Sequence, residues 1–96
     1  MKGLLIYFDV ADGKQKEFEA ATHVLVSRVR ERDPSYSLYS LARLRDLPTR
    51  YVLVQRFESY DTQLAHQTYD YVLECMPPMQ QFFAGPPTIH FLDIVD

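Results

Sequence analysis

His66 is the side chain of this sequence best suited to proton chemistry. It ends a short predicted helix, YDTQLAH, which follows directly on a strand-like segment, YVLVQRFES. Ser59 and Asp61 favour the first positions of a helix, so the predicted strand passes at once into the helix that carries the imidazole. A free imidazole has a pKa of about 6.5, and in an apolar pocket it could therefore deprotonate a phenol or a quinol. The alternative is a structural histidine that caps the helix, bonds to the backbone or orients a ligand.

Further side chains are candidates for a site around this imidazole. Tyr69 and Asp70 follow the histidine by three and four residues, and they share its helix face if the helix continues. Asp70 could then orient the imidazole, or it could cap the next helix. Tyr7 and Tyr39 lie in predicted strands, where either could line an aromatic pocket and donate a hydrogen bond to a ring oxygen. Phe83 could contact the same ligand, and the alternative for these rings is packing in the core or between subunits.

No motif for a metal ion or an organic cofactor is present. His23, His66 and His90 do not combine at a metal-ligand spacing such as HxxxH. Cys75 is the single cysteine, so it forms no intramolecular disulfide, and we expect it to be a small buried residue. We therefore expect no metal site and no cofactor.

The composition is that of one folded domain, residues 1–96, with 47% apolar residues. The net charge is −3 and no block of Lys and Arg occurs, which argues against nucleic acid as a partner. No apolar run reaches the length of a membrane span, and the N-terminus lacks the layout of a signal peptide. These observations predict a cytoplasmic protein that has neither nucleic acid nor a membrane as its partner.

Hydrophobic periodicity and turn residues predict the element order β-α-β-β-α-β. The segment 60–83 is expected to be helical in two pieces, because Pro77 and Pro78 lack backbone donors and should break or kink it. In a domain of this size the order predicts an α+β fold, a ferredoxin-like sandwich with an antiparallel four-stranded sheet. The other expected elements are a helix over residues 14–32 and strands over residues 3–10, 36–45, 50–57 and 88–95.

The predicted strands are apolar on both faces. Leu4, Ile6 and Phe8 alternate with Leu5 and Tyr7 in the first strand, and the third and fourth strands repeat the pattern. Two helices cover only one face of a four-stranded sheet, and leaving an apolar side chain in water forgoes about 1.5–3 kcal/mol. A second copy of the chain, packed sheet against sheet, is the simplest cover for the other face. We therefore expect a homodimer.

Short motifs are distributed over essentially the whole chain. They are Gly13-Lys14 with Glu17-Phe18, Asp33-Pro34-Ser35-Tyr36-Ser37-Leu38-Tyr39, Pro48, Tyr51-Val52-Leu53-Val54, Phe57-Glu58-Ser59, Leu64-Ala65-His66 and Gly85-Pro86. With these motifs and this order of elements, the chain resembles the antibiotic biosynthesis monooxygenase superfamily, whose members are dimeric α+β barrels of about this length. The resemblance implies a pocket between the sheet and the helices of one subunit.

The resemblance also implies a function: a cofactor-independent monooxygenase for a small phenolic, quinol or polyketide-type aromatic substrate. With His66 as the base, the electron-rich anion would react with oxygen without a metal or a flavin. The alternative, from a different class, is a non-catalytic dimeric barrel that binds a small hydrophobic ligand. An RNA-binding module on the same topology is disfavoured, because the segment YVLVQRFE contains no Gly and the chain is acidic.

Departures from the family pattern set aside its haem-degrading branch. That branch relies on an Asn, a Trp and a His on a helix, whereas this sequence contains no Asn and no Trp. Met76 occupies the position expected for the haem-ligating His. Gln55 stands where the family often has a Glu, so one candidate carboxylate base is absent, and Phe57 stands where it often has a Trp.

Overall fold

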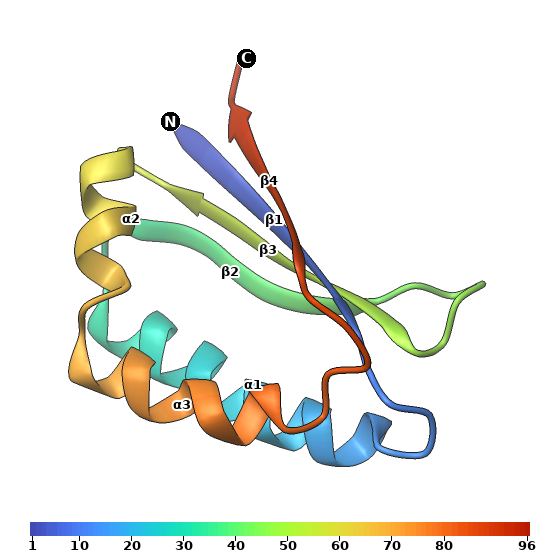
Figure 1. Cartoon of the computed structure of the whole chain (residues 1–96). Coiled ribbons are helices and arrows are strands. Elements are labelled where there is room, and N and C mark those ends of the chain that lie inside the picture. Colours follow the sequence, from blue (N-terminus) through green and yellow to red (C-terminus); the bar gives the residue numbers. More distant parts are fainter.

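Strands and helices follow the predicted order along residues 1–96, all of which the computed structural model describes (Figure 1). The elements are β1 (Lys2–Asp9), α1 (Gln15–Arg32), β2 (Tyr36–Arg43), β3 (Arg50–Phe57), α2 (Tyr60–His66), α3 (Asp70–Gln80) and β4 (Thr88–Asp93). The bounds of β3 are those predicted, and the other elements differ from the prediction by one or a few residues at their ends.

The four strands form one sheet in the order β2-β3-β1-β4, and all neighbouring strands are antiparallel. β2 and β3 form a hairpin, whereas β1 lies between β3 and β4. This topology confirms the predicted ferredoxin-like α+β fold. Figure 1 shows α1 and α3 side by side on one face of the sheet, with α2 at the end where β3 finishes and β2 starts.

The core lies between α1 and the inner face of the sheet. The cross-strand neighbours Phe8 and Tyr51 lie on this face, and Phe18 of α1 packs on both, with ring centroids 5.6 and 4.9 Å away. Buried residues recur along α1 at intervals of three and four, so one stripe of the helix closes the core. The buried residues of this stripe are Phe18, Thr22, Leu25, Val26 and Val29.

Both ends of α1 follow from the local sequence. Gly13 precedes the helix with φ at 85°, a left-handed conformation that glycine adopts without a steric penalty. The helix ends at Asp33, whose extended backbone has φ −122° and ψ 91°. The following Pro34 disfavours helical dihedral angles at Asp33, and the helix therefore ends there.

The predicted break at Pro77 and Pro78 is wrong, because α3 runs through both prolines. Each proline removes a hydrogen bond to the carbonyl group four residues earlier. This carbonyl belongs to Leu73 for Pro77 and to Glu74 for Pro78. Both of these residues are exposed, so water can satisfy the freed carbonyl groups and the helix tolerates the loss.

The helical segment is interrupted earlier, between the end of α2 and the start of α3. The Thr68 hydroxyl donates a hydrogen bond to the carbonyl oxygen of Ala65 at 2.7 Å, and the backbone N–H of Thr68 donates to the same oxygen at 3.0 Å. These bonds close the last turn of α2 and place His66 at its end. The helical segment is broken at Tyr69, whose backbone is extended with φ −67° and ψ 135°, and not at the prolines.

The outer face of the sheet carries apolar side chains that no helix covers, as predicted. The cross-strand pairs Leu5–Val54 and Tyr7–Val52 form its centre, and all four side chains are partly exposed. None of the helices combines the length and the apolar composition needed to traverse a bilayer.

Candidate functional site

A cavity of about 360 Å³ lies between the inner face of the sheet and the three helices. Most of its lining is apolar, and the exposed side chains of Ile89 and Phe91 border it on β4. α3 packs mainly against α1, which leaves room between α3 and the sheet. Mostly apolar cavities of this size with a few polar groups are typical of small-molecule sites.

His66 lines this cavity from the end of α2 and is only 4% exposed. Its Nδ1 atom lies 3.6 Å from Oδ2 of Asp33, and its Nε2 atom lies 3.4 Å from the hydroxyl of Tyr39. Oδ2 of Asp33 and Nδ1 of His66 are both buried and have no other hydrogen-bond partner. The carboxylate therefore favours the tautomer with the proton on Nδ1, which leaves the Nε2 lone pair on the side of Tyr39.

Asp33 reaches the imidazole because it ends α1. Its Oδ1 atom accepts a hydrogen bond from the backbone N–H of Ser35 at 3.2 Å and another from the Ser35 hydroxyl. These bonds fix the carboxylate, and Oδ2 is left for His66. The segment Asp33-Pro34-Ser35 predicts the end of the helix from its sequence, but the role of its carboxylate was missed, because only the fold brings the end of α1 to the end of α2.

Burial dominates the electrostatics of this site. It lowers the pKa of His66, and the nearby Asp33 carboxylate offsets only part of that effect. Burial also raises the pKa of Tyr39 and that of Tyr36 far above the usual value for a phenol. At neutral pH the imidazole is therefore uncharged and able to accept a proton, and Tyr39 keeps its hydroxyl proton.

Four tyrosine rings surround the imidazole. The ring centroids of Tyr36 and Tyr39 lie 4.7 and 5.6 Å from that of His66, and those of Tyr69 and Tyr71 lie 6.2 and 6.4 Å away. Tyr36 and Tyr39 are on β2, whereas Tyr69 directly precedes α3 and Tyr71 lies in its first turn. The unusual number of tyrosines in the sequence is thus largely explained by one cage around the histidine.

The structure brings some of the predicted site residues together and separates others. Tyr39 and Phe83 line the cavity with His66, as predicted. Tyr69 packs beside the imidazole but lines an open hollow on the outside of α3. Asp70 is exposed at the start of α3, so the carboxylate beside the imidazole is that of Asp33.

The prediction that Tyr7 lines the pocket is wrong. Tyr7 pairs with Val52 on the outer face of the sheet, where its ring packs edge-on against His90 at 5.9 Å and beneath the guanidinium of Arg50 at 5.2 Å. Side chains of one strand alternate between faces, and the inner face of β1 belongs to Leu4, Ile6 and Phe8. Because both faces of β1 are apolar, the alternation alone did not reveal which one faces the helices.

Two cavity residues were not singled out as contacts from the sequence. Gln55 lies on the inner face of β3 and Gln63 lies one turn before His66 on α2, and they are only 4% and 5% exposed. The signal that could have found them is a polar residue at an inward position of an apolar strand or helix. No group of three or more His, Cys, Asp or Glu side chains in the chain is arranged to hold a metal ion.

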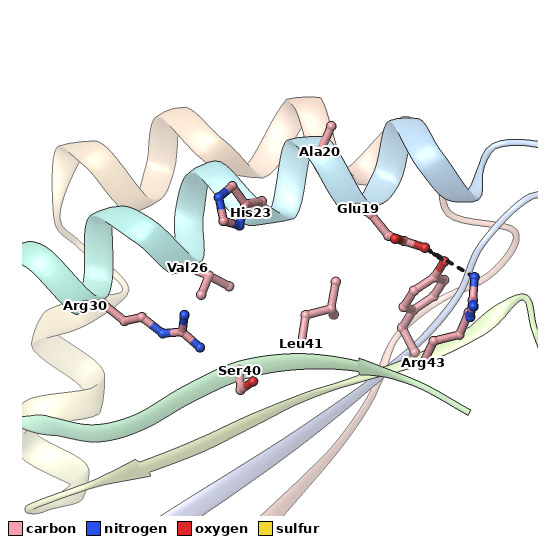
Figure 2. A pocket seen from close by; sticks show the side chains of 9 residues that line it. Glu19, Ala20, His23, Val26, Arg30, Ser40, Leu41 and Arg43 are labelled. Carbon is pink, nitrogen blue, oxygen red and sulfur yellow. Dashed lines mark hydrogen bonds and ion pairs between the residues drawn. The ribbon is translucent and has the colours of Figure 1, made fainter. Parts of the chain in front are cut away.

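A second hollow of about 590 Å³ lies between α1 and β2 (Figure 2). Its charged side chains already have partners, since Glu19 accepts a hydrogen bond from the Tyr51 hydroxyl and lies 3.6 Å from Arg43. At the other end, the Arg30 guanidinium donates to the backbone carbonyl of Tyr39 at 3.1 Å. The hollow contains none of the predicted site residues, so the candidate site is the apolar cavity with His66.

Comparison with known proteins agrees with this architecture. The sequence profile of the family described as "Antibiotic biosynthesis monooxygenase" matches residues 1–77. Among curated proteins, no sequence is significantly similar to this chain.

Several solved structures share the fold. A protein of Caulobacter crescentus, described as a "putative antibiotic biosynthesis monooxygenase", superposes with a TM-score of 0.94 at 27% identity, over 99% of this chain and 90% of its own. A protein of Nitrosomonas europaea with the same description has a TM-score of 0.90 at 22% identity, and each chain is covered completely. A third, from Bordetella bronchiseptica, has a TM-score of 0.83 at 23% identity over 98% of this chain and 96% of its own. With a family match over most of its length and this fold, the chain belongs to the antibiotic biosynthesis monooxygenase family.

Proposed function

We propose that this protein is a cofactor-independent monooxygenase for a small phenolic, quinol or polyketide-type aromatic substrate, and that His66 is its catalytic base. The observation that carries the proposal is an uncharged imidazole on the wall of a mostly apolar cavity, with a buried carboxylate behind it. The lowered pKa of His66 keeps the base in its active form at neutral pH.

The proposed reaction begins with transfer of a phenolic proton from the substrate to Nε2 of His66. Asp33 stabilises the imidazolium that forms, because its Oδ2 faces Nδ1. The electron-rich anion then reduces O₂ and forms a peroxide anion at a ring carbon that shares the negative charge, and the imidazolium protonates this peroxide to the hydroperoxide. For a CH₂ centre, loss of water leaves a carbonyl: one oxygen atom enters the product, the other leaves as water, and the substrate supplies all four electrons.

Tyr39 and Phe83 are the proposed contacts for the aromatic rings of the substrate, with Tyr39 also in a position to donate a hydrogen bond. Tyr39 already lies 3.4 Å from Nε2, so a substrate oxygen would bind beside these two groups. Tyr69 supports the imidazole from the other side and is proposed to position it. Tyr7 is not part of this proposal, because it lies on the opposite face of the sheet.

We also propose that the protein acts as a homodimer through the outer face of the sheet. Members of this family are generally small and dimeric. The uncovered pairs Leu5–Val54 and Tyr7–Val52 supply an apolar centre for sheet-to-sheet packing. In this dimer the helices and the cavity would lie on the inner face of each sheet, which points away from the partner subunit.

The second candidate function is non-catalytic binding of a small hydrophobic ligand in the same cavity. The observation that favours it is the contact between Tyr39 and Nε2, which gives the imidazole a partner within the protein. In this case His66 would be a structural group of the cavity wall, and its replacement would change affinity without any effect on oxygen chemistry.

Oxygen consumption separates the two functions. The protein is incubated aerobically with a panel of hydroquinones and anthrones, and the oxygen uptake is compared with that of the His66→Ala variant. Loss of a general base is expected to lower the rate by about 10²–10⁴-fold. The matched control is His23→Ala, which removes an exposed histidine of α1 that lies outside the His66 cavity and away from the outer face of the sheet. Equal rates for wild type and His66→Ala would refute His66 as the base, and ligand binding without any uptake would support the non-catalytic function.

A further inference from the structure

Apart from His66 and Tyr39, the polar side chains that line the His66 cavity are amides. No Asp, Glu, Lys or Arg side chain lines the cavity, whereas four glutamines do: Gln55, Gln63, Gln67 and Gln80. Gln55 and Gln63 are buried in its wall, and Gln67 and Gln80 are exposed near the ends of α2 and α3. The cavity therefore has no charged side chain that could bind an anion or a cation.

Gln55 has a particular position among these amides. It lies in the middle of β3, between Leu4 of β1 and Tyr39 of β2, and only 4% of the residue is exposed. Its side-chain oxygen has no hydrogen-bond partner within the protein. A buried amide without a partner is destabilising, so an apolar side chain would serve the core better unless a ligand completes the hydrogen bonds.

The surroundings of His66 disfavour an anionic ligand further. The nearest charged group is the Asp33 carboxylate, 3.6 Å behind the imidazole. A ligand carboxylate beside the imidazole would face that negative charge and would lose its hydration without gaining a cation. An uncharged ligand with hydroxyl or carbonyl groups loses less hydration, and the amides can replace the lost hydrogen bonds as donors and as acceptors.

From this arrangement we infer that the cavity selects uncharged ring compounds bearing hydroxyl or carbonyl groups over their carboxylated analogues, and that Gln55 is the residue that recognises the oxygen groups. That the selected ligand is a substrate rests on the proposed function; the selectivity itself concerns binding alone. The same selectivity is expected if the protein only binds its ligand and catalyses no reaction. Gln63 lies one turn before His66 on the same face of α2 and would contact a second oxygen of the same ligand.

Binding without oxygen tests the charge selection. Dissociation constants of naphthohydroquinone and of its analogue with one ring carboxylate are measured by anaerobic equilibrium dialysis with the wild-type protein. We expect the uncharged probe to bind at least about tenfold more tightly, because the carboxylate is desolvated without a compensating charge. Equal or tighter binding of the carboxylated probe, or no binding of either, would overturn the inference.

A second comparison tests Gln55. The ratio of the affinities for naphthohydroquinone and for naphthalene, which lacks oxygen, is measured for wild type and for Gln55→Leu. We expect Gln55→Leu to lower this ratio about threefold to tenfold, the value of one hydrogen bond. The control is Gln81→Leu, which replaces an exposed glutamine outside the cavity that bonds only to the carbonyl of Pro78. An unchanged ratio in a Gln55→Leu protein with a wild-type circular dichroism spectrum would exclude Gln55 as the recognising residue.

Both comparisons are made in the absence of oxygen, so they do not depend on turnover. If the selectivity fails while oxygen uptake depends on His66, the inference is wrong and the proposed function stands. If the selectivity holds while no probe consumes oxygen, the cavity is a selective binding site and the catalytic proposal is wrong.

Discussion

The burial of His66 makes the stability of this protein depend on pH in a way that one substitution should remove. Burial lowers the pKa of His66 in the folded protein, whereas in the unfolded chain a histidine has a pKa of about 6.5. Below that value the unfolded chain binds more protons than the folded protein at this residue. The free energy of unfolding therefore falls as the pH is lowered through about 6.5, and it levels off above that pH.

The size of this effect has an upper limit. One proton changes the free energy of unfolding by at most about 1.4 kcal/mol per pH unit, so His66 alone accounts for a loss of at most about 1.4 kcal/mol between about pH 7.5 and 5.5. A loss close to the limit means that the imidazole stays uncharged over this whole range. Carboxylates protonate mainly at lower pH and contribute little to the change.

Urea denaturation at a series of pH values measures the effect. We expect the free energy of unfolding of wild type to fall over this range, and that of His66→Gln to lack this part of the slope. Asp33→Asn removes the carboxylate that offsets part of the burial, so the pKa of His66 should fall further and the slope should extend to lower pH. His23→Gln is the control, since it replaces an exposed histidine of α1 that lies away from the outer face of the sheet. A constant difference between wild type and His66→Gln at every pH would refute the reasoning.

Three further predictions concern the core, the hollow beside α1 and the outer face. Phe57→Ala removes a ring that is 0% exposed and should cost about 3–5 kcal/mol in urea denaturation, whereas Phe91→Ala, at 60% exposed, should cost clearly less; similar losses would contradict the assigned core. Tyr51→Phe removes the hydroxyl that donates to Glu19 and should cost about 0.5–1.5 kcal/mol. Burial raises the pKa of Tyr51 to about 12, so an alkaline absorbance titration should lose a late phenol in this variant, and an unchanged titration curve would speak against the assignment. Val54→Asp places a charge at the centre of the outer face and should shift the sedimentation coefficient from dimer to monomer; a wild-type coefficient would exclude this face as the interface.

Much of the fold could be predicted because it depends on local signals. Asp12-Gly13 and Asp33-Pro34 mark the ends of α1, and the alternation in residues 50–57 identifies β3 with its observed bounds. Prolines predicted the end of a helix less well, since α3 continues through Pro77 and Pro78, where the carbonyl groups that lose their hydrogen bonds can bind water.

Around the candidate site, prediction succeeded for single residues and failed for their partners. His66 was identified from local signals, because an apolar strand, N-cap residues and a short helix that ends in a titratable imidazole follow one another in the sequence. Its carboxylate partner was sought four residues away, at Asp70, but it is Asp33, 33 residues earlier in the chain. A contact of this kind arises from packing the end of α1 against the end of α2, and no sequence period encodes it.

By itself the sequence determined the order of the strands and helices, the apolar character of both sheet faces and the position of His66 at the end of a short helix, because these properties depend on neighbouring residues. Only the tertiary structure decided which face of β1 meets the helices, so that Tyr39 lines the cavity and Tyr7 does not. It also decided that Asp33 lies behind the imidazole and that four glutamines, but no Asp, Glu, Lys or Arg, line the mostly apolar cavity. The physical reason is that the environment of a side chain, and with it the protonation of His66, depends on residues that are distant in sequence and are brought together only by packing.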